Sequence, residues 1–254
     1  MLCGPAATDG TGRKDARVIV WCAHLVLGYG MPMANTRSIF DILGPVMIGP
    51  SSSHTAGAVR LGLLARAILG TQPDDATITL HGSFASTGTG HGTDLALVAG
   101  LLGMRQDDPG IVDAFKRAES AGMTFTITTA DLGDVHANTA LIDVRAGDRS
   151  VSVLGSSVGG GEVLVTRIGR FEAHATGRMP LLLVEHTDAP GEIARVTEVI
   201  SAHGANIAEM RVSRTQRGSD ALMLIETDTP LPAAAVEAIA ALPGVVKARA
   251  VPVV

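Results

Sequence analysis

Three consecutive serines, a histidine and a threonine stand together at Ser51–Thr55, directly after a Gly-Pro pair and before an apolar pattern of helical spacing. A single hydroxyl at this place is the ordinary N-cap of a helix, so one serine needs no other explanation. Three hydroxyls beside an imidazole exceed what capping requires. They can hold a carboxylate at the positive end of a helix while the imidazole moves a proton. The candidate site residues here are Ser51, Ser52, Ser53, His54 and Thr55.

A glycine-rich stretch, GSFASTGTGHGTD at residues 82–94, is the second candidate. We expect a loop between a strand and a helix, where glycines let the backbone approach a ligand closely. The stretch is neither the G-x-G-x-x-G dinucleotide fingerprint nor a phosphate-binding loop with Gly-Lys-Ser/Thr. His91 taken alone is equally well explained as a hydrogen-bonded loop histidine. The candidate residues are Ser83, Thr87, Gly88, His91 and Asp94, and Asp94 is also a candidate cap for the next helix.

Two smaller features complete the set of polar candidates. His136 and Asn138 are two positions apart, so on an extended segment their side chains would point the same way. The sequence SVGGG at 157–161 indicates a flexible or anion-binding loop, or simply a turn. The histidines follow neither an H-x-x-x-H nor an H-E-x-x-H pattern, so we expect no metal site within this chain.

Composition narrows the class of protein. The chain has 254 residues, a formal net charge of −5 and no run of Lys or Arg, which argues against nucleic-acid binding. The two cysteines, Cys3 and Cys22, form neither a disulfide framework nor a complete metal ligand set, and a cytosolic setting fits best. Few aromatic residues and abundant Gly and Ala favour layers of helices and sheet.

The first 35 residues read as an extension rather than part of a domain. Basic residues precede the apolar run 18–27, as in a secretory signal, but His24 interrupts the run. The run is also shorter than the roughly 20 residues that a membrane span needs. We expect residues 1–35 to be a non-native or disordered extension.

Residues 36–178 alternate helical and strand patterns and are expected to form the first domain. Apolar residues from Val59 to Ile68 follow helical spacing, and Gly70 ends that helix. Further expected elements are a strand at 77–84, helices at 95–102 and 111–121, strands at 123–128, 139–145 and 150–154, a glycine loop at 155–161 and a strand at 162–168. Residues 167–179 are expected to form a linker.

Residues 180–254 form a second pattern. Strands are expected at 181–186, 206–214, 219–227 and 245–251, with helices from about 192 to Gly204 and at 232–241. The order βαββαβ is typical of a ferredoxin-like sandwich. The fold class is therefore α/β (α+β) followed by a ferredoxin-like domain.

These stretches together carry a resemblance. SIFDILGPVMIGPSSSHTAGAVRLG, GSFASTGTGHGTD, HANT and SVGGG are similar to the beta chain, or N-terminal half, of bacterial iron–sulfur-dependent L-serine dehydratases. DAPGEIARVTEVISAHGANIAEMRVSR resembles an ACT domain, the small amino-acid-sensing βαββαβ module. The match covers about residues 36–254. In the two-chain form of that family a separate alpha chain carries the cluster cysteines, which agrees with the absence of cysteine after Cys22.

The resemblance implies an activity and roles for residues. It implies that L-serine is converted to pyruvate and ammonia, with a [4Fe-4S] cluster held by the alpha chain acting as Lewis acid on the substrate hydroxyl. Ser51, Ser52 and Ser53 would bind the substrate carboxylate, His54 would take the α-proton, and His91 would orient substrate or relay a proton. The remaining substrate-binding candidates are Thr55, Ser83, Thr87, Gly88, Asp94, His136 and Asn138.

The sequence allows two roles for the second domain and a rival interpretation of the whole chain. Asn206 and Ile207 stand where ACT domains usually bind an amino acid at a paired interface. The alternative is that the domain serves only for homo-association. The same domain pair resembles the regulatory end of some phosphoglycerate dehydrogenases, in which the first domain is an allosteric substrate-binding module. On that interpretation the chain would be a non-catalytic amino-acid sensor.

Overall fold

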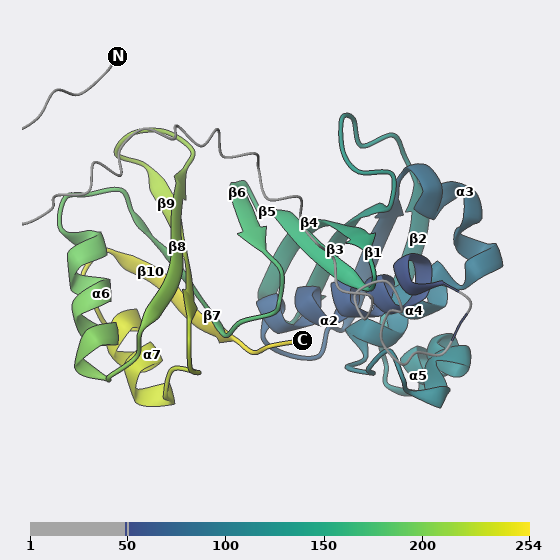
Figure 1. The fold of residues 1–254 in the computed structure, drawn as a ribbon, viewed down its shortest axis with the longest axis horizontal. Coiled ribbons are helices and arrows are strands. Elements are labelled where there is room, and N and C mark those ends of the chain that lie inside the picture. Colours follow the sequence, from purple (N-terminus) through teal and green to yellow (C-terminus); the bar gives the residue numbers. More distant parts are fainter. Residues whose placement is uncertain (1–48, 50) are drawn as a thin grey trace, which may run out of the picture. The chain divides into compact units, whose positions relative to one another are not determined.

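Two β-sheets organise the part of the chain that the computed structural model describes, which is residue 49 and residues 51–254 (Figure 1). The segment 1–35 lies outside the described residues, so its interpretation as an extension stays a prediction. The domain limits at 36–178 and 180–254 also stay predictions. The mixed α/β class followed by a ferredoxin-like domain is confirmed.

The first sheet has six strands in the order β2-β1-β3-β4-β5-β6. Their bounds are β1 Asp75–Leu80, β2 Thr124–Thr129, β3 Thr139–Ala146, β4 Arg149–Gly159, β5 Glu162–Ile168 and β6 Phe171–Ala175. Strands β1 and β2 are parallel, and every other neighbouring pair in this sheet is antiparallel. The helical elements of this region are η1 Ser52–Ala56, α2 Gly57–Leu69, α3 Gly82–His91, α4 Thr93–Leu101, η2 Pro109–Asp113 and α5 Ala114–Ser120.

Helix α2 is the centre of the first hydrophobic core. Leu61, Leu64 and Ile68 are buried on it at the expected spacing, and Gly70 ends it in the left-handed conformation, as the sequence predicts. Helices α2 and α4 pack so closely that only glycine fits at position 100. A Cβ there would lie 2.1 Å from the Val59 carbonyl oxygen. The helix that bears the serine cluster is therefore fixed rigidly to its neighbour.

Three local predictions for the first sheet are wrong. The strand predicted at 77–84 ends at Leu80, and the residues after it form helix α3. The glycine loop predicted at 155–161 is mostly strand, because β4 continues to Gly159 with Ser156 and Ser157 buried. The expected linker at 167–179 contains strand β6, whose Phe171 and Ala175 are buried in the core.

The second sheet has four strands in the order β10-β7-β9-β8, with all neighbours antiparallel. Its elements are β7 Leu181–Thr187, α6 Glu192–Ala202, β8 Ile207–Arg214, β9 Asp220–Thr227, α7 Ala233–Ala240 and β10 Val245–Val251. This is the predicted βαββαβ sandwich.

Both faces of this second sheet are covered. Leu182 and Val184 pack with the helices α6 and α7, whereas Leu181 and Leu183 belong to the same hydrophobic cluster as helix α2. Double coverage explains why Leu181–Val184 is a continuous apolar run rather than an alternating one.

Candidate active site

The serine cluster forms the first turn of the helix that continues as α2. Ser51 is extended and is the N-cap, and its Oγ accepts a hydrogen bond of 3.2 Å from the backbone N–H of His54. Residues Ser52–Ala56 wind as a π-helical turn, a form that occurs often at functional sites. One serine is thus the cap, and the others are left for another purpose.

His54 lies half-buried among hydroxyl groups. Its Nε2 is 3.0 Å from Ser83 Oγ, and its Nδ1 is 3.4 Å from Ser51 Oγ. A hydroxyl can donate or accept, so either neutral tautomer of the ring is accommodated. Hydroxyl groups therefore orient the imidazole from both sides, and no carboxylate among the described residues forms an ion pair with it.

His91 is the second titratable group of this site. Its ring centroid lies 5.1 Å from that of His54, and the two rings are tilted by 40°. Its Nδ1 lies 3.3 Å from the Thr87 carbonyl oxygen, one helical turn earlier. Thr55, which is buried, donates through Oγ1 to the His91 carbonyl oxygen at 3.3 Å, and this links the serine cluster to the end of α3.

Burial is the largest influence on His54, and it lowers the pKa of the imidazole below the ordinary value of 6.5. The nearby His91 lowers the pKa further, while a hydrogen bond with Ser83 acts in the opposite direction. A lowered pKa keeps His54 neutral at pH 7, and the neutral ring is the form that can accept a proton.

The glycine-rich stretch departs from expectation because it is a helix, not a loop. Phe84 is fully buried and anchors α3 to the core. Ser83 N–H donates to the Ala137 carbonyl oxygen at 2.7 Å, and Thr87 Oγ1 donates to the Ser83 carbonyl oxygen at 2.8 Å. These contacts outweigh the low helix propensity of glycine. Helix α3 carries Ser83, Thr87 and His91 at spacings of four, which places them on one face.

Some of the predicted site residues make no side-chain hydrogen bond with His54 in the described part of the chain. Gly88 is buried, and a Cβ there would meet Leu80 Cδ1 at 3.4 Å, so this glycine faces the core. Asp94 does not cap α4, whose N-cap is Gly92; its Oδ1 accepts from the adjacent Leu95 N–H at 2.8 Å. Ser52 and Ser53 are half-buried and make no side-chain hydrogen bond with another described residue.

His136 and Asn138 also lie apart from His54, with no side-chain contact to it among the described residues. His136 is exposed, and its Nδ1 accepts from the Asn138 backbone N–H at 3.1 Å. The Asn138 carbonyl oxygen accepts from Ser157 N–H at 2.9 Å. This segment supports the start of α3 through Ala137 and joins it to β4.

Ser157 is a neighbour of the serine cluster that the sequence alone did not single out as a site residue. It is fully buried, and its Oγ has no hydrogen-bond partner among the described residues. A Cβ on Gly57 would lie 2.0 Å from that Oγ, so Ser157 packs directly beneath the junction of η1 and α2. The signal that could have found it is its place at the start of SVGGG.

The candidate effector residues of the second domain border an open hollow of about 510 Å³ along helix α6. Both Asn206 and Ile207 line it, and Asn206 Nδ2 donates to Asp228 Oδ2 at 2.7 Å. Effector binding there stays a prediction.

Two further features concern residues 49 and 51–254, the part of the chain that the structure describes. No group of three or more His, Cys, Asp or Glu side chains is gathered there in a way that could hold a metal ion. No helix in that part of the chain is long and apolar enough to cross a membrane.

The fold and the site define a class: an α/β domain with a hydroxyl-flanked histidine at a helix start, joined to a βαββαβ domain. The family model for the serine dehydratase beta chain matches residues 38–140, and that for the ACT domain matches residues 181–244. The second domain is an ACT domain.

Individual relatives give the same result. The chain is 40% identical over 211 residues to a probable L-serine dehydratase beta chain of Bacillus subtilis, covering 83% of this chain and 96% of the relative. It is 35% identical over 196 residues to the L-serine dehydratase beta chain of Peptoniphilus asaccharolyticus, covering 76% and 88%. The chain belongs to the family of L-serine dehydratase beta chains.

A weaker similarity bears on the rival interpretation. The chain is 27% identical over 210 residues to a D-3-phosphoglycerate dehydrogenase of Synechocystis, covering 80% of this chain but only 37% of that protein.

Proposed function

We propose that this chain is one subunit of a two-chain, iron–sulfur-dependent enzyme that converts L-serine to pyruvate and ammonia. The similarity to two beta chains over most of their length supports the substrate class. The single observation that carries the mechanism is the half-buried His54, whose pKa is lowered and whose Nε2 faces Ser83 Oγ at 3.0 Å.

The residues described here do not fit an iron–sulfur cluster. Such clusters are held by cysteine thiolates, and the only cysteines of the sequence, Cys3 and Cys22, lie outside the described residues. The donors around His54 are hydroxyl groups and a second imidazole. In this proposal the [4Fe-4S] cluster is held by the partner alpha chain, and none of the steps below passes through it.

The share of the reaction assigned to this chain is binding and proton transfer. The hydroxyls of Ser51, Ser52 and Ser53, at the positive end of the helix, bind the substrate carboxylate. Neutral His54 accepts the proton from the substrate Cα as the Cβ–O bond breaks. The hydroxide that leaves takes up one proton and departs as water, and an enamine remains. The enamine becomes an imine, and hydrolysis of the imine gives pyruvate and ammonia.

His91 and the face of α3 complete the site in this proposal. His91 orients the substrate or relays the proton taken by His54, because its ring lies 5.1 Å from that of His54. Ser83 and Thr87 project from the same helical face. The other predicted substrate-binding residues are Asp94, His136 and Asn138, whose side chains make no hydrogen bond with His54 or His91 among the described residues.

The ACT domain is proposed to associate with a second copy of the chain. Strand β8 is at an edge of the four-stranded sheet, so one of its sides has backbone groups unpaired within that sheet. Pairing of two such sheets would place Asn206 and Ile207 near an interface where an amino-acid effector binds. Analytical ultracentrifugation of the full chain tests this, and a monomer at micromolar concentration contradicts it.

The proposed activity is tested by an anaerobic assay of pyruvate formation from L-serine. The assay compares this chain alone, the cluster-loaded alpha chain alone and the mixture. We expect turnover only in the mixture. An assembled, cluster-loaded mixture that binds serine without producing pyruvate would favour the rival interpretation, a non-catalytic amino-acid sensor.

A further inference from the structure

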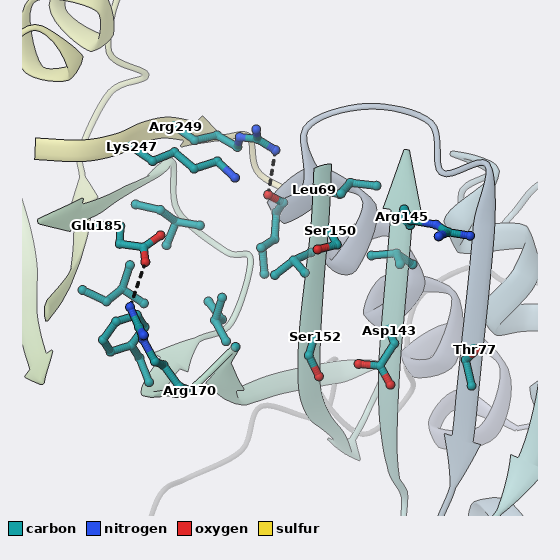
Figure 2. Close-up of a pocket in the computed structure, with 18 of the residues that line it drawn as sticks. Leu69, Thr77, Asp143, Arg145, Ser150, Ser152, Arg170, Glu185, Lys247 and Arg249 are labelled. Carbon is teal, nitrogen blue, oxygen red and sulfur yellow. Dashed lines mark hydrogen bonds and ion pairs between the residues drawn. The ribbon is translucent and has the colours of Figure 1, made fainter. Parts of the chain in front are cut away.

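A cavity of about 520 Å³ lies away from His54, and the described residues that line it come from both sheets (Figure 2). Strands β3 and β4 contribute one wall, the turn between β5 and β6 a second, and strands β7 and β10 of the ACT domain a third. The volume is within the range of small-molecule sites. None of the candidate residues around His54 lines this cavity.

Charged side chains are concentrated in this cavity. The acidic lining residues are Asp75, Asp143 and Glu185, and the basic ones are Arg145, Arg170, Lys247 and Arg249. The pairing of these groups decides which charges are available to a ligand.

The charges of two of the basic residues are already balanced by carboxylates. Arg145 Nη2 lies 3.8 Å from Asp75 Oδ2. Arg170 Nη2 lies 3.5 Å from Glu185 Oε1 and also pairs with Asp220, and its guanidinium lies over the Phe171 ring. Neither arginine needs a further anion.

Lys247 and Arg249 differ, because neither forms an ion pair with a carboxylate among the described residues. They are two positions apart on β10 and therefore project from the same face of the strand. Arg249 Nη1 donates to the Ile68 carbonyl oxygen at 2.9 Å, which holds the guanidinium against the last turn of α2. Its other N–H groups have no described hydrogen-bond partner.

The surroundings disfavour the charged form of both Lys247 and Arg249. Partial burial is the largest influence and lowers the pKa of Lys247 and of Arg249. Repulsion by Arg249 lowers the pKa of Lys247 further, and Arg149 at the start of β4 lowers the pKa of both. Glu185 offsets part of this effect for Lys247. A bound anion would remove the unfavourable repulsion among these cations.

We propose that Lys247 and Arg249 bind a small oxyanion, a carboxylate or phosphate group, in this cavity. Figure 2 shows the Lys247 side chain extending toward strand β4, where Ser150 and Ser152 lie. Their hydroxyls supply donors on the opposite wall. The ligand joins β10 of the ACT domain to the six-stranded sheet and so couples the two domains.

The test is calorimetric titration of the full chain with sodium phosphate and, separately, sodium pyruvate, each against sodium chloride at equal ionic strength. We expect saturable one-site binding of at least one oxyanion and none of chloride. Lys247→Gln is expected to weaken that binding by about tenfold or more, since a charged hydrogen-bonding group is lost. Lys247 is exposed, so its replacement should not impair folding, and far-UV circular dichroism checks this.

Lys116→Gln is the matched control, because Lys116 is an exposed lysine whose partner is Asp113 and which does not line the cavity. Binding of phosphate alone or of pyruvate alone supports the proposal and identifies the ligand class. The proposal is overturned if neither oxyanion binds, if Lys247→Gln binds like the unmodified chain, or if Lys116→Gln loses binding equally. Binding is read without turnover, so the result does not depend on the proposed dehydratase activity.

Discussion

His54 Nε2 and Ser83 Oγ lie 3.0 Å apart, although the two residues are 29 positions apart in the sequence. One residue belongs to the turn that begins the central helix, and the other belongs to the first turn of α3. Their contact unites the two polar stretches of the sequence into one group and gives the imidazole a fixed direction.

Ser83→Ala tests whether this contact positions His54. We expect kcat of the assembled enzyme to fall by about tenfold, the equivalent of one hydrogen bond, with little change in KM. Ser86→Ala is the control, because Ser86 is exposed on the same helix and bonds only the Ser83 carbonyl oxygen. A rise in KM at unchanged kcat would instead mean that the Ser83 hydroxyl only binds substrate.

His91→Gln tests the electrostatic influence on His54. Burial remains in the variant, but the repulsion from a charged His91 is removed, so the pKa of His54 should rise part of the way toward 6.5. Because neutral His54 is the active form, the acidic limb of kcat/KM should move to higher pH. Nuclear magnetic resonance titration of the His54 ring in the full chain gives the same pKa without requiring turnover.

The matched variant for this pH experiment is His203→Gln, since His203 is exposed at the end of α6. It should leave the titration of His54 unchanged. A His54 pKa that stays the same or falls in His91→Gln would contradict the assigned repulsion.

Gly100→Ala tests the close approach of α2 and α4. A Cβ there would lie 2.1 Å from the Val59 carbonyl oxygen, so the helices must separate, at a cost of about 1–3 kcal/mol in the free energy of unfolding. Gly90→Ala, in helix α3, meets nothing within 4 Å and should be neutral or stabilising by roughly 0.5–1 kcal/mol. Urea unfolding of both variants checks the difference, and equal stabilities would contradict the packing argument.

The sequence predicted those parts of the fold in which periodicity and turn residues agree. The end of α2 at Gly70 and the βαββαβ order follow from such patterns. The glycine-rich stretch misled the prediction because four glycines between residues 82 and 92 indicate a loop, whereas burial of Phe84 makes the segment helical. Tertiary packing overrode local propensity there.

The candidate site was predictable only where it depends on neighbouring residues in the sequence. Ser51–His54 is a local motif, so the N-cap and the additional hydroxyl groups can be predicted from the order of residues. The contact between His54 and Ser83 depends on where α3 docks, and the buried Ser157 beneath Gly57 depends on β4 continuing into the glycine-rich segment. Both contacts join segments that are far apart in the sequence and depend on the order of strands in the sheet. Local residue spacing does not predict that order.

The central claim is that His54 supplies the base of the reaction, and the most direct measurement is kcat of His54→Gln in the assembled, cluster-loaded two-chain enzyme. Complex formation and serine binding are measured in the same preparation. We expect kcat to fall by about 10²- to 10⁴-fold while assembly and serine binding persist. A variant that assembles, binds serine and keeps most of its activity would contradict it and place the base on another residue.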